Sequence, residues 1–301
     1  MSSTTPVTPH DRPVLGSGIF QIGGDLPVCR LGFGAMRIVG PGVWGPPADR
    51  ENSLRVLRRA VELGVTLIDT AEVYGPHVSE ELIREALHPY PDDLVIATKG
   101  GIHRPSEREM TPNGHPEFLR AGVEGSLRRL GVERIDVWQL HRIDPTVPVE
   151  ESVGALTELR ADGKVDKIGL SEVSLAELQR ANQVAPIATI QNCYSVADRQ
   201  HEPLVTYCER AGIGFIPWFP LATGRLAEPG GLLEPIAERL GVTASQLALA
   251  WLLQRSPAVL PIPGTGSLAH LEENCASATV SLSADDMEAI EKSFLGGPGL
   301  G

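Results

Sequence analysis

Cysteine is scarce in this chain of 301 residues, and its four cysteines stand far apart without a C-x-x-C pair. This spacing argues against a disulfide framework and a zinc site, and is typical of small, reduced core residues. No apolar run approaches the roughly 20 residues that span a bilayer. The first ten residues are polar and contain no hydrophobic signal core. We therefore expect a cytoplasmic protein without a resident metal or a membrane partner.

Basic residues are outnumbered: 26 Lys and Arg face 38 Asp and Glu, and the formal net charge at pH 7 is −12. No basic stripe is visible, which argues against a nucleic-acid partner or an anionic membrane surface. Hydrophobic residues make up 42% of the chain and charged residues 21%, as in an ordinary globular protein. The length allows one large core. We expect a single domain over residues 13–295, between a flexible leader (1–12) and a flexible tail (296–301).

The chain does contain a repeated pattern of amphipathic helix, glycine and β-rich run. Glycine just after a helix adopts the left-handed conformation at little cost, so the chain can turn back into a strand. The pattern occurs at 57–68, 118–140, 149–170 and 204–217. Further strand candidates at 31–36, 94–98, 188–191 and 258–262 bring the strands to eight. Eight parallel βα units predict an α/β fold, a closed (β/α)₈ TIM barrel; an open doubly wound sheet is the alternative.

Two features fall outside this eightfold series. Segments 14–19 and 21–28 flank Gly23-Gly24-Asp25 and predict a β-hairpin that plugs the N-terminal end of the barrel. Two extra helices are expected near 232–240 and 287–294. Capping-box patterns, or an acidic variant of them, mark helix starts at Ser174, Thr243 and Ser283.

Lysine is as scarce as cysteine, with four against 22 arginines, and one of the four, Lys99, ends an apolar strand. An ammonium at the end of a buried strand suits proton handling or Schiff-base chemistry, although a lone lysine there can also reach water. Two other strand-like runs end on Asp69, with Tyr74 five residues later, and on His141. The carboxyl ends of parallel strands share one face of the molecule. We therefore expect these four side chains to meet there.

The chemistry of these four side chains fits proton donation to a carbonyl oxygen. A phenol has an unperturbed pKa of about 10, and a nearby ammonium makes it readier to release its proton. Lys99 would tune Tyr74 in this way, with Asp69 as its counter-ion. A neutral His141 would orient the carbonyl oxygen. A hydride from a nicotinamide would complete the reduction.

A dinucleotide site of the Rossmann type is not indicated, since no G-x-G-x-x-G follows a strand. A barrel can instead bind phosphates on its later loops. The run 262–267 joins a strand to a helix starting near Ala269 and offers backbone N–H groups and hydroxyls to a phosphate. Trp218 offers a flat face to a heteroaromatic ring. Taken singly, the run also fits an ordinary turn and Trp218 fits an ordinary core position.

In their order along the chain, these residues resemble the aldo-keto reductase superfamily. The motifs that carry the resemblance are Asp69-x-Ala71-x-x-Tyr74-Gly75, Thr98-Lys99, Gln139-Leu140-His141, Gly169-Leu170-Ser171, Gln191-Asn192-x-Tyr194-Ser195, Pro217-Trp218-x-Pro220-Leu221 and Ile262-Pro263-Gly264-Thr265 through Glu273-Asn274. The loop 37–47 resembles that of a bacterial branch that includes reductases of pyridoxal-like aldehydes.

The resemblance implies an NADPH-dependent oxidoreductase that reduces a small-molecule aldehyde or ketone to an alcohol. Tyr74 would be the general acid, assisted by Lys99, Asp69 and His141. NADP(H) would lie extended across the barrel mouth, and NAD(H) is a possible substitute. Trp44, Tyr74 and His141 would border the substrate. The residues implied for the cofactor are Gly34, Ala35, Met36, Asp69, Ser171, Glu172, Gln191, Trp218, Pro220, Leu221, Gly224, Pro263, Gly264, Thr265, Ser267, His270, Glu273 and Asn274.

Two departures from the family pattern bear on the cofactor. Glu172 stands where many members have asparagine, and a carboxylate accepts from a carboxamide N–H but cannot donate. Gly264 and His270 stand where lysine and arginine are common, and fewer fixed cations imply weaker discrimination between NADPH and NADH. On the substrate side, Arg37, His103 and Arg104 either hold an anionic group or are solvated.

Two other functions remain open on the sequence alone. A barrel aldolase would use Lys99 as a Schiff base. A non-catalytic subunit, like the barrel-shaped β-subunits of potassium channels, would bind NADP(H) and signal through a partner. The sequence makes no prediction of the oligomeric state.

Overall fold

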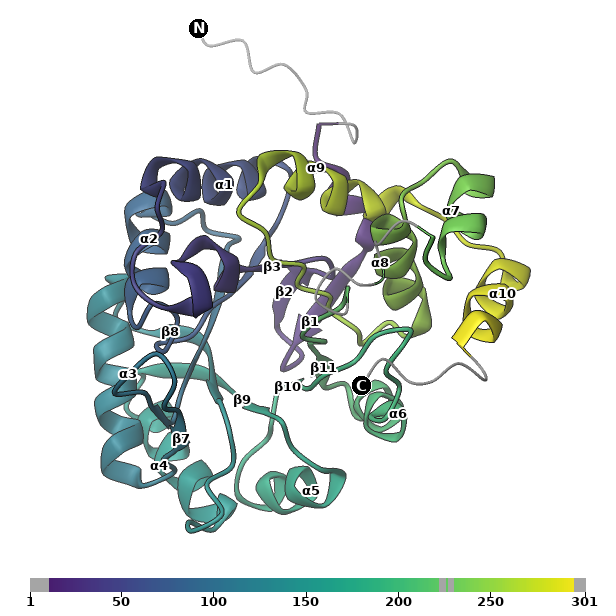
Figure 1. The fold of residues 1–301 in the computed structure, drawn as a ribbon. Coiled ribbons are helices and arrows are strands. Elements are labelled where there is room, and N and C mark those ends of the chain that lie inside the picture. The colour runs from purple at the N-terminus through teal and green to yellow at the C-terminus, as the bar shows by residue number, and fades with distance from the viewer. Residues whose placement is uncertain (1–10, 222–225, 227–229, 295–301) are drawn as a thin grey trace, which may run out of the picture.

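Seven parallel strands form one curled sheet in the computed structural model, which describes residues 11–221, 226 and 230–294 (Figure 1). Their order in the sheet, β11–β10–β9–β8–β5–β4–β3, follows the chain, as expected where each strand is followed by a returning helix. The strands are β3 (Phe33–Gly34), β4 (Leu67–Asp69), β5 (Val95–Gly100), β8 (Ile135–Leu140), β9 (Val165–Ser171), β10 (Thr189–Gln191) and β11 (Gly214–Phe215).

The segment that follows α8 (Ala244–Arg255) closes the sheet into a ring. On one side, the Phe215 N–H donates to the Ala258 carbonyl and the Leu260 N–H donates to the Phe215 carbonyl, both at 2.8 Å. On the other side, the Gly32 N–H donates to the Pro261 carbonyl at 2.9 Å. The segment is thus the eighth strand of a (β/α)₈ barrel, which confirms the fold predicted from the sequence. It is less regular than its neighbours because proline has no N–H to complete the ladder.

Within the described residues, one helix follows each barrel strand and covers the outside of the ring (Figure 1). Two more helices, α7 (Glu234–Leu240) and α10 (Ala284–Phe294), pack against each other beside α8, which confirms the two extra helices. The other barrel helices are α1 (Arg50–Glu62), α2 (Val78–Leu87), α3 (Pro116–Leu130), α4 (Val149–Ala161), α5 (Leu175–Val184), α6 (Glu202–Ala211) and α9 (Leu268–Ala276).

Helix starts and ends follow the sequence patterns. Ser174 and Thr243 form complete capping boxes with the residues three positions later. The Asp286 N–H donates to Ser283 Oγ at 3.2 Å, and the Ser283 N–H donates back to Asp286 Oδ2 at 2.9 Å, so the acidic variant works in the same way. Gly131, just after α3, adopts a φ of 71°, the left-handed conformation expected of a glycine at this place.

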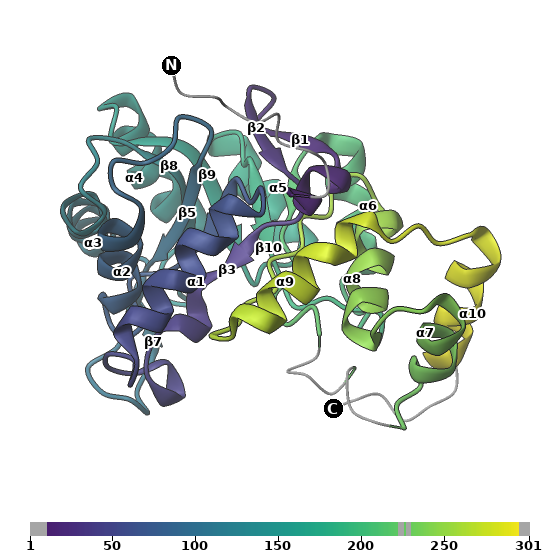
Figure 2. The same ribbon diagram turned by 90° about the horizontal axis from the view of Figure 1, so that it is seen from above.

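An antiparallel hairpin, β1 (Ile19–Ile22) and β2 (Leu26–Cys29), covers one end of the ring (Figure 2). Ile22 and Val28 pack with barrel residues such as Leu67 and Ile216 in one buried apolar cluster, so the hairpin closes the N-terminal end of the barrel. The predicted hairpin is confirmed, but its first strand does not lie at 14–19. Pro13–Ser17 forms a 3₁₀ helix, η1, because proline favours the first turn of a helix.

The first barrel strand is also shorter than the predicted 31–36. β3 ends at Gly34, and Ala35–Ile38 winds into a second 3₁₀ helix, η2. A Cβ on Gly34 would lie 2.6 Å from the Ile262 carbonyl oxygen, so only glycine permits this close approach of the first and last strands. Directly after this contact the chain leaves the sheet and crosses the barrel mouth.

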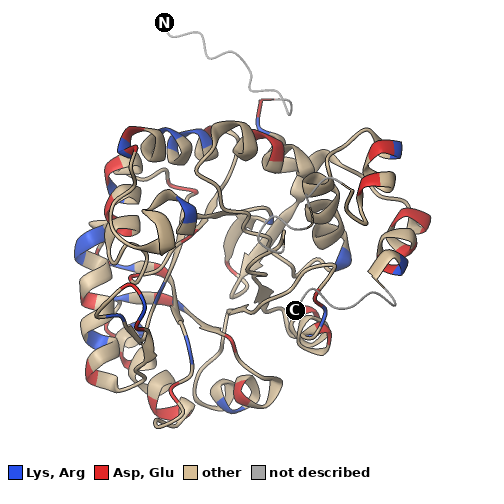
Figure 3. Cartoon of the chain, viewed as in Figure 1, with Lys and Arg blue, Asp and Glu red and all other residues tan. Residues whose placement is uncertain are grey.

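Lys, Arg, Asp and Glu are spread over the outer helices with both signs mixed (Figure 3). No helix in the described part of the chain is long and apolar enough to cross a membrane. The cytoplasmic location stays a prediction, as do the domain limits. The expected tail and residues 1–10 of the expected leader lie outside the described residues.

Candidate active site

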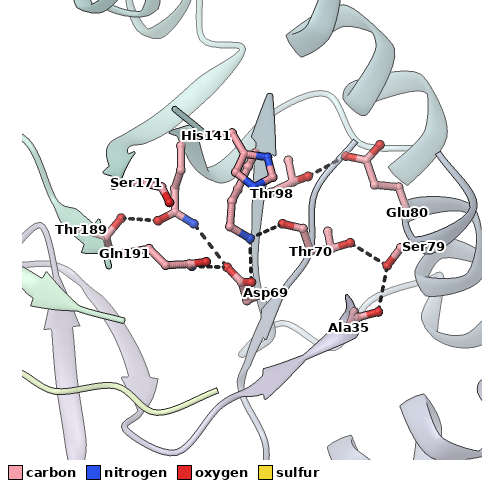
Figure 4. A network of polar contacts seen from close by, with 12 residues as sticks. Ala35, Asp69, Thr70, Ser79, Glu80, Thr98, His141, Ser171, Thr189 and Gln191 are labelled. Atoms are coloured by element: carbon pink, nitrogen blue, oxygen red, sulfur yellow. Dashed lines mark hydrogen bonds and ion pairs between the residues drawn. The ribbon is translucent and has the colours of Figure 1, made fainter. Parts of the chain in front are cut away.

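Four side chains meet at the carboxyl ends of three adjacent strands. Asp69 ends β4, Lys99 is the last residue but one of β5, and His141 directly follows β8. Tyr74 lies in the loop between β4 and α2. Because β4, β5 and β8 are neighbours in the sheet, their ends bring these segments to one place. Figure 4 shows Asp69 and His141 there. The structure thus brings together the four residues that the sequence singled out.

Lys99 is completely buried, and its ammonium is held by a carboxylate and a carbonyl. Nζ donates to Asp69 Oδ2 and to the Thr70 carbonyl oxygen, both at 2.7 Å. It also lies 5.2 Å from the centre of the Tyr74 ring. Burial alone would lower the pKa of Lys99, but the charge of Asp69 and the contacts with Asp69 and Tyr74 outweigh burial and raise it. Lys99 is therefore a fixed cation beside the phenol.

Asp69 is the centre of a polar network (Figure 4). Its Oδ1 accepts from Gln191 Nε2 at 2.7 Å and from Gln139 Nε2 at 3.3 Å. Gln139 Oε1 in turn accepts from Thr189 Oγ1 at 3.3 Å. Gln139 belongs to one of the motifs of the resemblance, but the sequence analysis assigned no role in the site to Gln139 or Thr189. The available signal was that Gln139 stands two residues before His141, on the same face of the strand.

The Tyr74 ring and the His141 imidazole meet edge to face, with 6.2 Å between ring centres and an interplanar angle of 81°. Burial raises the pKa of Tyr74, and the charge of Lys99 works against this rise. Burial, with the positive charges of Lys99 and Arg142, lowers the pKa of His141 well below its usual value. At neutral pH the site therefore holds a protonated phenol and a neutral imidazole. His141 Nδ1 is buried without a hydrogen-bond partner in the described part of the chain.

A cavity of about 1020 Å³ adjoins this group. Asp69, Tyr74 and His141 line it, and Lys99 lies behind them. The sequence also implied a set of cofactor residues, and those on the cavity wall are Gly34, Met36, Asp69, Ser171, Gln191, Trp218, Pro220, Leu221, Pro263, Gly264, Thr265, His270, Glu273 and Asn274. Among the described residues, Ala35, Glu172 and Ser267 are not on the wall, and Gly224 lies outside those residues.

Glu172 does not face the cavity, where the sequence had placed it beside a carboxamide. Its backbone is left-handed, with a φ of 55°. Its Oε1 accepts from the Cys193 N–H at 3.0 Å and from the indole N–H of Trp218. The carboxylate therefore holds Trp218, which does line the cavity. Glu172 thus acts on the site through the position of Trp218 and not from the cavity wall.

The loop before α9 is organised by two hydroxyls. Thr265 Oγ1 accepts from the Ser267 N–H at 3.0 Å, and Ser267 Oγ accepts from the His270 N–H at 3.4 Å. Ser267 is thus the N-cap of α9, which explains why it is not on the cavity wall. His270 and Arg37, which belongs to η2, are exposed and border the same cavity.

Other parts of the wall come from the loops after β3, β4, β5 and β8. Trp44, expected beside the substrate, is not among the described lining residues; the Arg104 guanidinium lies over its ring, 5.1 Å from the centre. His103 packs edge-on against Phe118, with 6.3 Å between ring centres. Lining residues that the sequence analysis did not identify include Val73, Ile102, Met110, Pro112 and Arg142.

The Aldo/keto reductase family model matches residues 30–294. The chain belongs to this family. An uncharacterized oxidoreductase, C215.11c, of Schizosaccharomyces pombe is 48% identical to this aldo-keto reductase over 269 residues, 89% of this chain and 88% of that protein. Pyridoxine 4-dehydrogenase of Escherichia coli is 42% identical over 283 residues, 92% of this chain and 98% of that protein.

A crystal structure of an aldo-keto reductase from Klebsiella pneumoniae in complex with NADPH superposes on this one with a TM-score of 0.78 at 27% sequence identity. The alignment covers 92% of this chain and 94% of that chain. The aldo-keto reductase described here is therefore an enzyme, an oxidoreductase, and the resemblance stated from the sequence is confirmed.

Proposed function

We propose that this enzyme reduces an aldehyde or a ketone to an alcohol with NADPH, and that Tyr74 donates the proton. The observation that carries the proposal is the gathering of a phenol, a buried ammonium–carboxylate pair and a neutral imidazole at one large cavity. When bound, the nicotinamide supplies a hydride to the carbonyl carbon. The side chains of this chain have the complementary task of holding and protonating the carbonyl oxygen.

Tyr74 keeps its proton at rest because burial raises its pKa. As negative charge develops on the carbonyl oxygen, the Lys99 cation stabilises the phenolate that remains when the proton leaves. Asp69 keeps Lys99 charged in its buried position. A neutral His141 offers an N–H to the same oxygen and thereby orients it.

The nicotinamide end of the cavity has suitable partners. The Trp218 indole, held by Glu172, offers a face for stacking on the ring. Ser171 and Gln191 offer a hydroxyl and an amide to a carboxamide, although one N–H of Gln191 is already used by Asp69.

The phosphate end would lie at the start of α9, where the helix dipole favours an anion. The residues that would surround the phosphates and the adenosine here are Thr265, His270, Glu273 and Asn274. Binding of NADPH by the Klebsiella pneumoniae structure supports the same class of cofactor. The Escherichia coli relative, a pyridoxine 4-dehydrogenase, makes pyridoxal-like aldehydes the first substrates to try.

The state of Lys99 speaks against a Schiff-base aldolase. A Schiff base needs a neutral, accessible amine. Lys99 is buried, its pKa is raised, and two of its hydrogens are engaged by Asp69 and the Thr70 carbonyl.

The replacement Tyr74→Phe tests the proposal. It removes the proton donor and keeps the ring, so we expect the rate of NADPH-dependent aldehyde reduction to fall by about 10²–10⁴-fold, the usual contribution of a general acid. The NADPH dissociation constant should stay within twofold of the wild type, measured by fluorescence titration. Tyr207→Phe in α6, away from the cavity, is the matched control. Full activity of the Tyr74 variant would show that another group supplies the proton.

A further inference from the structure

Arg104 joins three separate loops at the barrel mouth. Its Nη1 donates to the carbonyl oxygens of Val43 and Val73, both at 2.8 Å. Its Nη2 donates to the carbonyl oxygens of Gly42 at 3.0 Å and Glu107 at 3.2 Å. One guanidinium thus ties the loop after β3, the loop after β4 and its own loop between β6 (Ile102–His103) and β7 (Thr111–Pro112).

The loop after β3 needs such a restraint because its backbone is strained. Gly42 and Val43 have φ values of 67° and 59°. Left-handed backbone is easy for glycine, but it is a true outlier for a β-branched residue and is strained. The Val43 carbonyl accepts a second bond, from the Gly75 N–H at 3.1 Å. Gly75 directly follows Tyr74, so the strained loop is fixed relative to the proposed acid.

The hydrogen bonds of Arg104 also exclude the role that the sequence left open for it. Both terminal nitrogens are engaged by backbone carbonyls, and the face of the guanidinium covers Trp44. In the described part of the chain, no carboxylate lies within ion-pair distance of Arg104. Arg104 itself borders the cavity, but its Nε is buried and has no hydrogen-bond partner among the described residues. Because four of its five N–H donors are bound to backbone carbonyls and the fifth is buried, Arg104 holds loops together and has no fork to offer an anionic substrate.

The three joined loops supply an apolar wall next to Tyr74. The residues on it are Val43, Val73, Ile102, Met110 and Pro112, all of which line the cavity. Met110 has 58% of its surface exposed and lies at the cavity mouth. Most of the residues assigned to the cofactor follow the later strands, and only Gly34, Met36 and Asp69 on the cavity wall lie at the ends of β3 and β4. The five apolar wall residues are not among them, so we assign this wall to the part of the cavity left to the substrate.

We propose that Arg104 is a positioning residue that fixes this apolar wall, and that the wall selects aldehydes carrying an uncharged apolar or aromatic group. The inference rests on the proposed function, since it assigns the substrate class of the same site. Without Arg104 the strained loop relaxes, Val43 and Met110 lose their fixed places, and apolar substrates lose their contacts. Small polar aldehydes make few contacts with the wall, so their binding is little affected.

The test compares two aldehydes and two loop variants. Arg104→Met keeps the aliphatic stem and removes the donors. We expect the ratio of kcat/KM for benzaldehyde over that for glycolaldehyde to fall by about tenfold, mainly through KM for benzaldehyde, as expected when contacts of one or two carbon groups are lost. Arg104→Lys keeps a charge and some donors, and should recover part of this ratio. Arg108→Met, an exposed arginine of the same loop, is the control and should leave the ratio unchanged.

A second measurement does not depend on catalysis. Hydrogen exchange at residues 42–45 and 75 should speed up in Arg104→Met and stay as in the wild type in Arg108→Met. An unchanged substrate ratio together with unchanged exchange would overturn the inference, as would an equal weakening of NADPH binding and of both aldehydes. If even the wild type reduced neither aldehyde while the exchange change persisted, the proposed function would fail and the loop restraint by Arg104 would stand.

Discussion

At the scale of single residues, the site depends on charges that are buried and paired. Lys99 and Asp69 are both nearly inaccessible, and removal of one partner from such a pair typically costs about 3–5 kcal/mol. Directly behind them lies a second acidic group that the sequence analysis did not identify. Glu80 is fully buried and bound by Arg129 and Thr98, and Glu72, 7% exposed, lies 4.0 Å from the same Arg129. Arg129 thus lies within ion-pair distance of two carboxyl groups, those of Glu80 and Glu72.

Glu72 makes the stability depend on pH. Burial and the charge of Glu80 raise its pKa from 4.5 to about 7 in the folded protein. The folded state therefore holds this proton more tightly than the unfolded chain, and stability present below pH 4.5 is lost as the pH rises toward 7, by about 3 kcal/mol. Glu72→Gln removes the titrating group and should flatten this decline in urea unfolding at pH 5, 6 and 8. Glu117→Gln, at an exposed position of α3, should leave the decline as it is. An undiminished decline in Glu72→Gln would show that other groups cause it.

At the scale of elements, the repeated helix, glycine and strand pattern was sufficient to predict the barrel, because each signal is local. Gly131 and the caps at Ser174 and Thr243 act as their neighbours in the sequence imply. One error, the strand expected at 14–19, missed a local signal, because Pro13 starts a 3₁₀ helix there. The other errors concern contacts between distant segments. At Gly34, where β3 ends, the last strand passes so close that only glycine fits, and no local pattern contains that contact. The same holds for Arg104, whose carbonyl partners lie up to 62 residues away in the sequence.

One cap is expected to matter for binding as well as for stability. Thr243 starts α8, and its Oγ1 also donates to Glu273 Oε1 at 2.6 Å, on α9. Glu273 lines the cavity. Thr243→Ala should lower the free energy of unfolding by about 1 kcal/mol and weaken NADPH binding about threefold or more, equivalent to roughly 0.7 kcal/mol. Ser174→Ala removes a cap of the same type away from the cavity. It should lower the free energy of unfolding by a similar amount and leave the NADPH dissociation constant unchanged. Equal NADPH dissociation constants for the two variants would show that Glu273 does not contribute to cofactor binding.

At the scale of the whole molecule, the cavity collects side chains from loops along nearly the entire chain. The first and last strands of the barrel meet at the edge of this cavity, and we call this contact the seam. A Cβ on Gly264 would lie 2.5 Å from the Gly34 carbonyl oxygen there. Asp69, Tyr74 and His141 could be predicted because each follows a recognisable strand. The shape of the cavity wall could not be predicted, since it depends on how the loops after different strands meet. A ligand that bridges this seam stabilises the closed ring, and its affinity therefore appears as a rise in Tm.

This coupling gives a test of cofactor preference. His270 is exposed on the cavity rim near Gly264, at a place that suits a fixed cation for a 2′-phosphate. His270→Arg adds a permanent charge with a forked donor, so we expect NADPH affinity to rise by about tenfold, roughly 1.4 kcal/mol, and NADH affinity to stay unchanged. In thermal unfolding, the rise in Tm caused by NADPH should then exceed that caused by NADH by a wider margin than in the wild type. His115→Arg, the same exchange at an exposed site outside the cavity, should leave the margin as it is. An equal gain for both cofactors would place the 2′-phosphate elsewhere on the rim.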